Sequence, residues 1–156
     1  MKSKYYYNSS RAPSPNMPRS IGVVGIIYDG DKVLFEERRS EDEKWSFIGG
    51  KVEDNESVLQ ALFREIKEET GQDVSVYEFF GIFSEPGRII EYLNGGVKQV
   101  VTIAFKVKLL DNNVKCSNES KSIRFRDINE MSEDRFVETH IPILRALKEN
   151  KKMHID

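Results

Sequence analysis

Three carboxylates crowd one face near the end of a predicted helix, and this feature constrains the chain more than any other. The stretch 50–72 reads GKVEDNESVLQALFREIKEETGQ. Glu65, Glu68 and Glu69 are spaced so that they lie on neighbouring positions of one helix face, where like charges repel. A bound cation would relieve that repulsion, and carboxylate oxygens suit magnesium or manganese better than zinc or copper. The segment therefore predicts metal-dependent phosphate chemistry.

The ends of this helix can be predicted from its capping residues. Ser57 is a good N-cap, Gln60 completes a capping box with it, and Gly71 supplies the residue that ends the helix. Helical spacing predicts an apolar face that packs on a core, made of Leu59, Leu62, Phe63 and Ile66. The same spacing predicts that Ala61 lies on the other side, with the glutamates.

An acidic helix face taken alone is more often a solvated surface than a metal site. Three further features favour the metal site here: the buried-side periodicity, the adjacent Arg64-Glu65 pair, and a glycine turn ahead of the helix. The short strand-like stretch 45–47 leads into that turn, Gly49-Gly50. A turn without side chains can bring backbone carbonyls close to the carboxylates.

The fixed spacing of these residues resembles the signature of a known family. Counted from Gly50, it is Gly, five residues, Glu56, seven residues, Arg64-Glu65-Ile66, one residue, Glu68-Glu69, one residue and Gly71. At every charged and glycine position this pattern resembles the Nudix box of the Nudix hydrolases. Gln72 stands where the family has an aliphatic residue, and Ile48 stands where it usually has proline. Neither position carries metal-binding chemistry.

The resemblance implies a fold and a metal. The expected fold class is α/β (α+β), a Nudix-type α/β/α sandwich with a curved mixed sheet between helices. Residues 20–152 would form this single domain, and residues 1–19, polar and rich in proline, would be an irregular N-terminal arm. The expected cofactor is Mg²⁺, for which Mn²⁺ can substitute.

The resemblance also implies roles for individual residues. Glu65 and Glu69 would be the main metal ligands, with the Gly49 carbonyl as a third and Glu68 holding a second cation or a metal-bound water. Arg64 would orient the glutamates through Glu56. The general base stays open between a box glutamate and Glu119, which lies on a later loop and is otherwise a solvated residue. Arg39 and Arg88 are candidates for contacts with substrate phosphates, and Trp45 either stacks on a base or packs in the core.

The reaction implied is hydrolysis of a nucleoside diphosphate linked to another moiety X, giving a nucleoside monophosphate and phosphate-X. ADP-ribose is the candidate substrate, because Pro86 lies fifteen residues beyond Gly71, near a proline of ADP-ribose-cleaving relatives. Turns favour Pro-Gly for their own reasons as well. Three alternatives remain open: a nucleoside triphosphate pyrophosphohydrolase that removes damaged nucleotides, an enzyme acting on RNA 5′ ends, and a nucleotide sensor without turnover.

Composition bounds the partners of the chain. Its 156 residues suit one domain, and 24 Lys and Arg against 26 Asp and Glu give a net charge of −2, which disfavours duplex nucleic acid. Cys116 is the sole cysteine, so a reducing cytoplasm is the expected location, and no apolar run suggests a membrane. Tyr5 to Tyr7 would attach the arm to the body or to a second subunit, which leaves a homodimer open. His140 and His154 are far apart in the sequence and predict neither a metal site nor a catalytic triad.

The remaining pattern predicts a β-rich domain that ends in a helix. Apolar and β-branched runs predict strands at 21–28, 32–38, 73–84, 97–110 and 122–128. Asp29-Gly30-Asp31 predicts a hairpin between the first two strands, and Pro86-Gly87 and Asn94-Gly95-Gly96 predict turns. A final helix is predicted around 140–150.

Overall fold

The computed structural model describes residues 3–39 and 42–156 of the chain. The predicted strands and both predicted helices are present, with small shifts of their ends. The strands are β1 (Lys4–Tyr7), β2 (Ser20–Asp29), β3 (Lys32–Arg38), β4 (Trp45–Ser46), β5 (Ile48–Lys51), β6 (Val74–Phe83), β7 (Arg88–Glu91), β8 (Val97–Leu109), β9 (Ser120–Arg126) and β10 (His154–Ile155). The helices are α1 (Val58–Thr70) and α2 (Ile141–Lys148), with short 3-10 turns η1 (Ile128–Glu130), η2 (Glu133–Arg135) and η3 (Glu138–His140) between β9 and α2.

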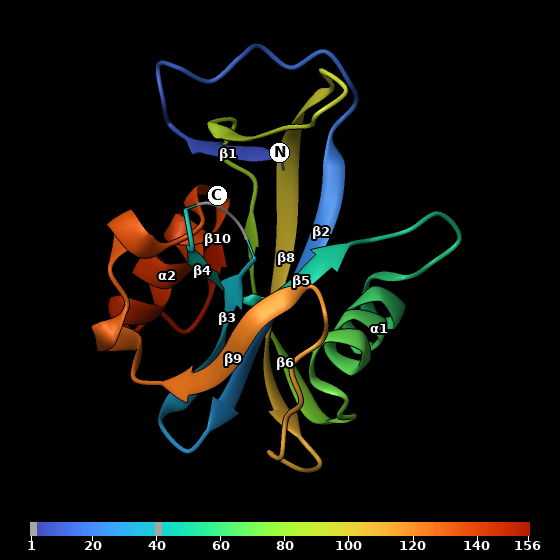
Figure 1. Cartoon of the computed structure of the whole chain (residues 1–156), viewed down its shortest axis with the longest axis vertical. Coiled ribbons are helices and arrows are strands. Elements are labelled where there is room, and N and C mark those ends of the chain that lie inside the picture. Colours follow the sequence, from blue (N-terminus) through green and yellow to red (C-terminus); the bar gives the residue numbers. More distant parts are fainter. Residues whose placement is uncertain (1–2, 40–41) are drawn as a thin grey trace.

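A mixed, curled sheet forms the centre of the molecule. Strands β2 and β8 run parallel, with Ser20 opposite Val100 and Ile27 opposite Val107. β6 joins β8 antiparallel, and β3 returns antiparallel from β2 through a tight turn in which Gly30 has a φ of 62°. Helices α1 and α2 lie on opposite sides of this sheet (Figure 1). The arrangement confirms the predicted α/β/α sandwich.

Two hydrophobic clusters fill the two sides of the sheet. Val23 and Ile27 of β2 belong to the cluster under α1, whereas Val24 and Ile26 belong to the cluster under α2. Because side chains of a strand alternate between its faces, a strand that is covered on both sides needs apolar residues at nearly every position. This is why the stretch 21–28 is apolar throughout.

Helix α1 begins and ends as predicted. The Ser57 side chain accepts from the Gln60 amide, the Gln60 side chain completes the box, and Gly71 adopts a left-handed φ of 75°. The predicted faces need a correction at two positions. Ala61 is fully buried under the helix, because its small side chain lets the backbone approach the sheet, while Phe63 is 40% exposed and packs edge-on against Tyr77.

Both ends of the chain join the sheet, which corrects the expectation of an arm that is irregular throughout. Residues 4–7 form β1, which pairs antiparallel with β7 so that Tyr5 lies opposite Ile90. β10, which lies beyond the predicted domain end at 152, pairs parallel with β6 at Gly81 and Ile82. The single-domain assignment itself stays a prediction. Within the residues that the structure describes, no helix has the length and apolar character needed to span a bilayer.

Candidate active site

A cavity of about 560 Å³ opens at the centre of the curled sheet, beside α1. Its volume lies within the range of roughly 300–1,000 Å³ that is typical of small-molecule sites. β2, β3, β5 and α1 line one part of it, and β1, β7, β8, the loop before β9 and the η3 turn line the rest. The lining contains four carboxylates, Glu36, Glu65, Glu69 and Glu119, and three cationic side chains, Arg38, Arg39 and Lys51.

Arg64 organises the acidic residues at the edge of this cavity. Its Nε donates to Glu56 Oε2 at 2.6 Å and its Nη2 donates to Glu56 Oε1 at 2.9 Å, while Nη1 donates to Glu65 Oε1 at 2.8 Å. These charge-assisted bonds lower the pKa of Glu56 to about 2. Nη1 also reaches Glu68 Oε2 at 3.3 Å. Arg64 is thus placed to hold the Glu65 carboxylate in one orientation, with Glu56 as its anchor.

Glu69 is the most unusual of the pocket carboxylates. Its Oε2 is buried and has no hydrogen-bond partner among the described residues. Burial raises its pKa far above the usual range, and the charges of Glu36, Glu65 and Glu119 raise it further. Burial likewise raises the pKa of Glu65, against the opposing effect of Arg64. A buried carboxylate oxygen without a hydrogen-bond partner lowers the stability of the folded protein, so a ligand that binds this oxygen would be stabilising.

The double glycine, predicted as a turn, instead lies within strand β5, which runs beside the Glu65 carboxylate. A Cβ at Gly50 would come within 2.3 Å of Glu65 Oε1, and a Cβ at Gly49 would come within 2.1 Å of the Val23 carbonyl oxygen. Both glycines lie in β5, where Gly49 pairs with Val24 and Gly50 pairs with Val23. Any side chain at Gly50 would occupy the space that the Glu65 carboxylate fills. The double glycine is therefore required by close approach.

These residues fit a hard divalent cation. Among residues 3–39 and 42–156, no three His, Cys, Asp or Glu side chains already converge as a closed metal cage. The fit rests instead on the unpartnered Glu69 oxygen and on the oxygen-only donor set beside the double glycine. Such donors suit Mg²⁺ or Mn²⁺. Glu68 differs from the other two, because its side chain is 59% exposed and it does not line the cavity.

Two residues of β3 that sequence reasoning missed also line the cavity. Glu36 accepts from Ser120 Oγ at 2.7 Å, and its charge acts on Glu69. Arg38 Nη2 donates to the Tyr5 hydroxyl at 2.8 Å, and its guanidinium lies 4.8 Å from the centre of the Tyr5 ring. The spacing of Glu36 and Arg38 along a strand was the available signal, since alternate residues share a face.

The other predicted site residues are not all brought together. Glu119 is exposed on the loop before β9 and lines the cavity, and Arg39 lines it while its Nε donates to the Ser120 carbonyl at 3.1 Å. Trp45 does not line the cavity, and Arg126 lies over its ring at 5.3 Å. His140, for which no site was predicted, does line it.

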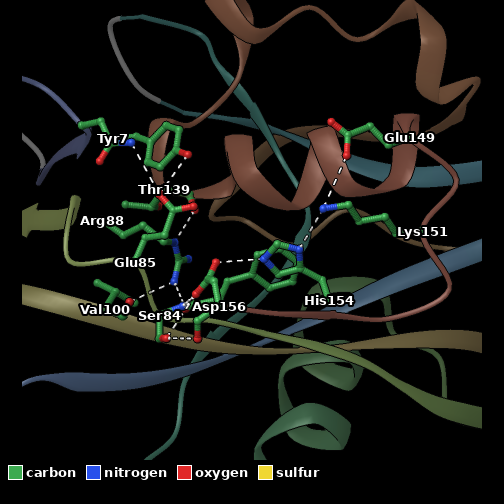
Figure 2. Close-up of polar contacts among 12 residues, drawn as sticks. Tyr7, Ser84, Glu85, Arg88, Val100, Thr139, Glu149, Lys151, His154 and Asp156 are labelled. Atoms are coloured by element: carbon green, nitrogen blue, oxygen red, sulfur yellow. Dashed lines mark hydrogen bonds and ion pairs between the residues drawn. The ribbon is translucent and has the colours of Figure 1, made fainter.

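Arg88 corrects a prediction. It was expected to meet substrate phosphates, but its side chain is completely buried and does not line the cavity. Its Nε donates to the Thr139 carbonyl and its Nη1 donates to the Phe83 and Val100 carbonyls (Figure 2). Burial lowers its pKa to about 10. Arg88 is the first residue of β7, and its side chain points into the protein interior. The preceding turn residues Pro86-Gly87 gave no indication of this orientation.

Comparisons with known proteins agree with this geometry. Residues 18–147 match the model of the NUDIX domain. The chain is 32% identical over 114 residues to an ADP-ribose pyrophosphatase of Methanocaldococcus jannaschii, covering 72% of this chain but only 64% of that protein. It is 29% identical to a MutT-like protein of Streptomyces ambofaciens, covering 92% of this chain and 86% of that protein.

Solved structures show the same fold. A NUDIX hydrolase from Nitrosomonas europaea superposes with a TM-score of 0.71 at 24% identity, over 90% of this chain and 78% of that one. The signature of Gly50, Glu56, Arg64, Glu65 and Glu69 thus lies in the expected fold, with Glu65 and Glu69 at a cavity. The chain therefore belongs to the Nudix family.

Proposed function

We propose that this protein hydrolyses, with Mg²⁺, a nucleoside diphosphate linked to a second moiety, and that ADP-ribose is such a substrate. The observation that carries the proposal is the buried Glu69 Oε2, which has no hydrogen-bond partner among the described residues and lies at a cavity of about 560 Å³ that also holds Arg38, Arg39 and Lys51. Carboxylates that need a cation and cations that suit phosphates line the same space. Mn²⁺ would substitute for Mg²⁺.

In this proposal the residues divide the work as follows. Glu65, Glu69 and the Gly49 carbonyl would hold the cation, which when bound would neutralise phosphate charge and lower the pKa of a water. Arg64, fixed by Glu56, keeps the Glu65 carboxylate in place.

Glu119 is the proposed general base. Its side chain is exposed and lines the cavity, and it takes no part in the Arg64 network. Glu68, a candidate from the sequence, is held by Arg64 outside the cavity lining. Arg39 is retained as a phosphate ligand because it lines the cavity, and Arg88 is not.

Two observations support a diphosphate with a second moiety as substrate. The cavity extends from the carboxylates to Tyr5 and Tyr92, so a molecule longer than a diphosphate can contact both parts. The relative in Methanocaldococcus jannaschii is called an ADP-ribose pyrophosphatase. The Pro86-Gly87-Arg88 turn does not support the choice of ADP-ribose, since Arg88 is buried and does not line the cavity.

A nucleoside triphosphate is the second candidate substrate. The relative that covers most of this chain is called MutT-like, and a further relative in Escherichia coli, 40% identical over 78 residues, is called a CTP pyrophosphohydrolase. The cytoplasm is the proposed location, and a monomer or a homodimer is compatible with a cavity built from one chain.

Side-by-side kinetics on ADP-ribose and a panel of nucleoside triphosphates test the proposal. We expect AMP and ribose 5-phosphate from ADP-ribose, a higher kcat/KM for ADP-ribose than for any triphosphate, and no turnover in EDTA. A kcat/KM for a triphosphate that is roughly tenfold above that for ADP-ribose corresponds to a difference of about 1.4 kcal/mol in barrier. That result would make the triphosphate the assigned substrate in place of ADP-ribose. Turnover that persists after exhaustive chelation would show that the reaction does not need the cation.

A further inference from the structure

His140 lies outside the carboxylate cluster and lines the same cavity. It is the last residue of the η3 turn, and α2 begins directly after it. As the N-cap residue of α2 it makes no side-chain capping bond. Its ring packs against Phe47, with ring centres 5.9 Å apart. The imidazole therefore has no local role in the helix that would explain its place in the cavity wall.

One hydrogen bond fixes which ring nitrogen of His140 carries the proton. The Phe47 backbone N–H donates to His140 Nδ1 at 3.2 Å. Nδ1 must therefore offer its lone pair, and the proton of the neutral ring is on Nε2. In the part of the chain that the structure describes, Nε2 has no acceptor. Burial, reinforced by the charges of Arg88 and Arg38, lowers the pKa of His140 to about 3, so the ring is a neutral donor at physiological pH.

Arg88 holds the backbone of the η3 turn next to His140. Its Nε donates at 2.9 Å to the carbonyl of Thr139, the residue before His140, and its Nη2 donates to Thr102 Oγ1 at 2.7 Å. Nη1 donates to the Val100 carbonyl at 2.9 Å, as Figure 2 shows. Thr139, Val100 and Thr102 all line the cavity. Among the described residues, no carboxylate hydrogen-bonds to this guanidinium, so its bonds join the η3 turn to β8.

We infer that His140 is a substrate-binding residue that donates its Nε2–H to a phosphate oxygen of the substrate, and that Arg88 is a positioning residue that acts through it. This inference rests on the proposed function and adds a residue to it. A phosphate oxygen is the matching acceptor because Arg38, whose charge acts on His140, lines the same cavity. An anionic oxygen between a neutral N–H and a guanidinium satisfies both donors.

The test compares two amide substitutions at His140. Asparagine places its oxygen near the position of Nδ1, so His140→Asn keeps the acceptor for Phe47 and loses the distal donor. Glutamine is longer and can place its NH₂ near the position of Nε2, so His140→Gln keeps the donor. Calorimetric titration with ADP in Mg²⁺ buffer gives the dissociation constant of each variant, and thermal unfolding verifies that each is folded.

We expect roughly tenfold weaker ADP binding for His140→Asn and a loss within about threefold for His140→Gln, the scale of one hydrogen bond to a charged group. Adenosine, which has no phosphate, should bind both variants and the parent protein alike. An unchanged ADP affinity in folded His140→Asn overturns the inference. An equal loss for ADP and adenosine overturns the phosphate as the acceptor.

A double-mutant cycle tests the role of Arg88. Arg88→Lys keeps the charge but cannot hold the fork of bonds, so it should weaken ADP binding several-fold in the parent protein and add little in the His140→Asn background. Arg145→Lys, at an exposed arginine paired with Glu133, is the matched control. It should leave ADP affinity unchanged both in the parent protein and in the His140→Asn background. Equal losses in both backgrounds would show that Arg88 does not act through His140. Failure of the substrate proposal would appear separately, as intact ADP binding without hydrolysis of ADP-ribose.

Discussion

At the scale of single residues, Glu69 gives the clearest link between burial and chemistry. Its Oε2 is buried and, within the part of the chain that the structure describes, has no hydrogen-bond partner, which disfavours the charged form, yet the chain keeps this carboxylate beside Glu36 and Glu65. A divalent cation reverses the balance, since it stabilises the charged form of all the carboxylates it contacts. Glu69 therefore lowers the stability of the cation-free protein in a way that a bound cation can offset.

Substitution of this residue should separate folding from activity. Glu69→Gln should keep the fold, because the buried apolar side of α1 is formed by Ala61, Leu62 and Ile66. It should lower kcat about a thousandfold, or about 4 kcal/mol, because a neutral amide binds a divalent cation poorly. Steady-state kinetics and circular dichroism measure the two effects.

The control for this prediction is Glu68→Gln. Glu68 is exposed and does not line the cavity, so this variant should lose far less activity than Glu69→Gln. A folded Glu69→Gln enzyme with turnover near that of the parent would contradict the assignment of Glu69 as a metal ligand.

At the scale of elements, β5 and α1 act as one unit. The capping box at Ser57 and the left-handed Gly71 fix the length of the helix, and Gly50 of β5 lets the strand run against the Glu65 carboxylate. Arg64 joins the elements directly, since its Nη2 donates to the Lys51 carbonyl at 3.0 Å. The geometry of the site depends on this close approach.

Two glycine substitutions in β5 should have different consequences. Gly50→Ala puts a methyl group where Glu65 has its carboxylate, a flexible group that can move, so activity should fall steeply with a stability loss below about 1.5 kcal/mol. Gly49→Ala puts a methyl group against the Val23 carbonyl, a backbone atom of the central strand, so stability should fall by about 2–4 kcal/mol. Urea unfolding and assays at saturating Mg²⁺ measure both quantities.

Gly30→Ala serves as the reference for this pair. Nothing lies within 4 Å of a Cβ at Gly30, so only its φ of 62° opposes the substitution, at a cost of about 1 kcal/mol. Equal activity losses for Gly50→Ala and Gly30→Ala would mean that the Glu65 carboxylate need not lie against the double glycine.

At the scale of the whole molecule, the raised pKa values of Glu65 and Glu69 tie stability to pH. A group whose pKa is higher in the folded than in the unfolded protein contributes stability that is full below its unfolded pKa and is lost as pH rises toward its folded pKa. For glutamate the unfolded pKa is about 4.3. In EDTA, the free energy of unfolding contributed by these residues should therefore decline above that pH, by at most about 1.4 kcal/mol per pH unit for each group.

Thermal unfolding in EDTA across the neutral range measures this decline, with Glu69→Gln as the comparison. The stability of Glu69→Gln relative to the parent should rise with pH, and added Mg²⁺ should raise the Tm of the parent more than that of the variant. A relative stability that does not change with pH would contradict the raised pKa of Glu69.

The local elements of this protein could be predicted from its residues. The ends of α1, the hairpin at Gly30 and the register of Glu65 and Glu69 follow from interactions within a few residues, which spacing and residue type encode. The apolar run 21–28 likewise indicated a strand that is covered on both faces. The family pattern then implied the α/β/α sandwich, which the structure shows, and the roles of Glu65 and Glu69 as metal ligands, which stay a prediction.

Which distant residues share the cavity depends on the packing of the whole fold. Glu36 and Arg38 come from β3, Tyr5 from β1 and His140 from the η3 turn, and they meet because the sheet curls and β1 pairs with β7. Arg88 is buried and bonds to the carbonyls of Thr139 and Val100, which line the cavity, and does not line it itself. Spacing along the sequence carries no information on these long-range contacts, because they depend on how strands far apart in the chain pack against one another.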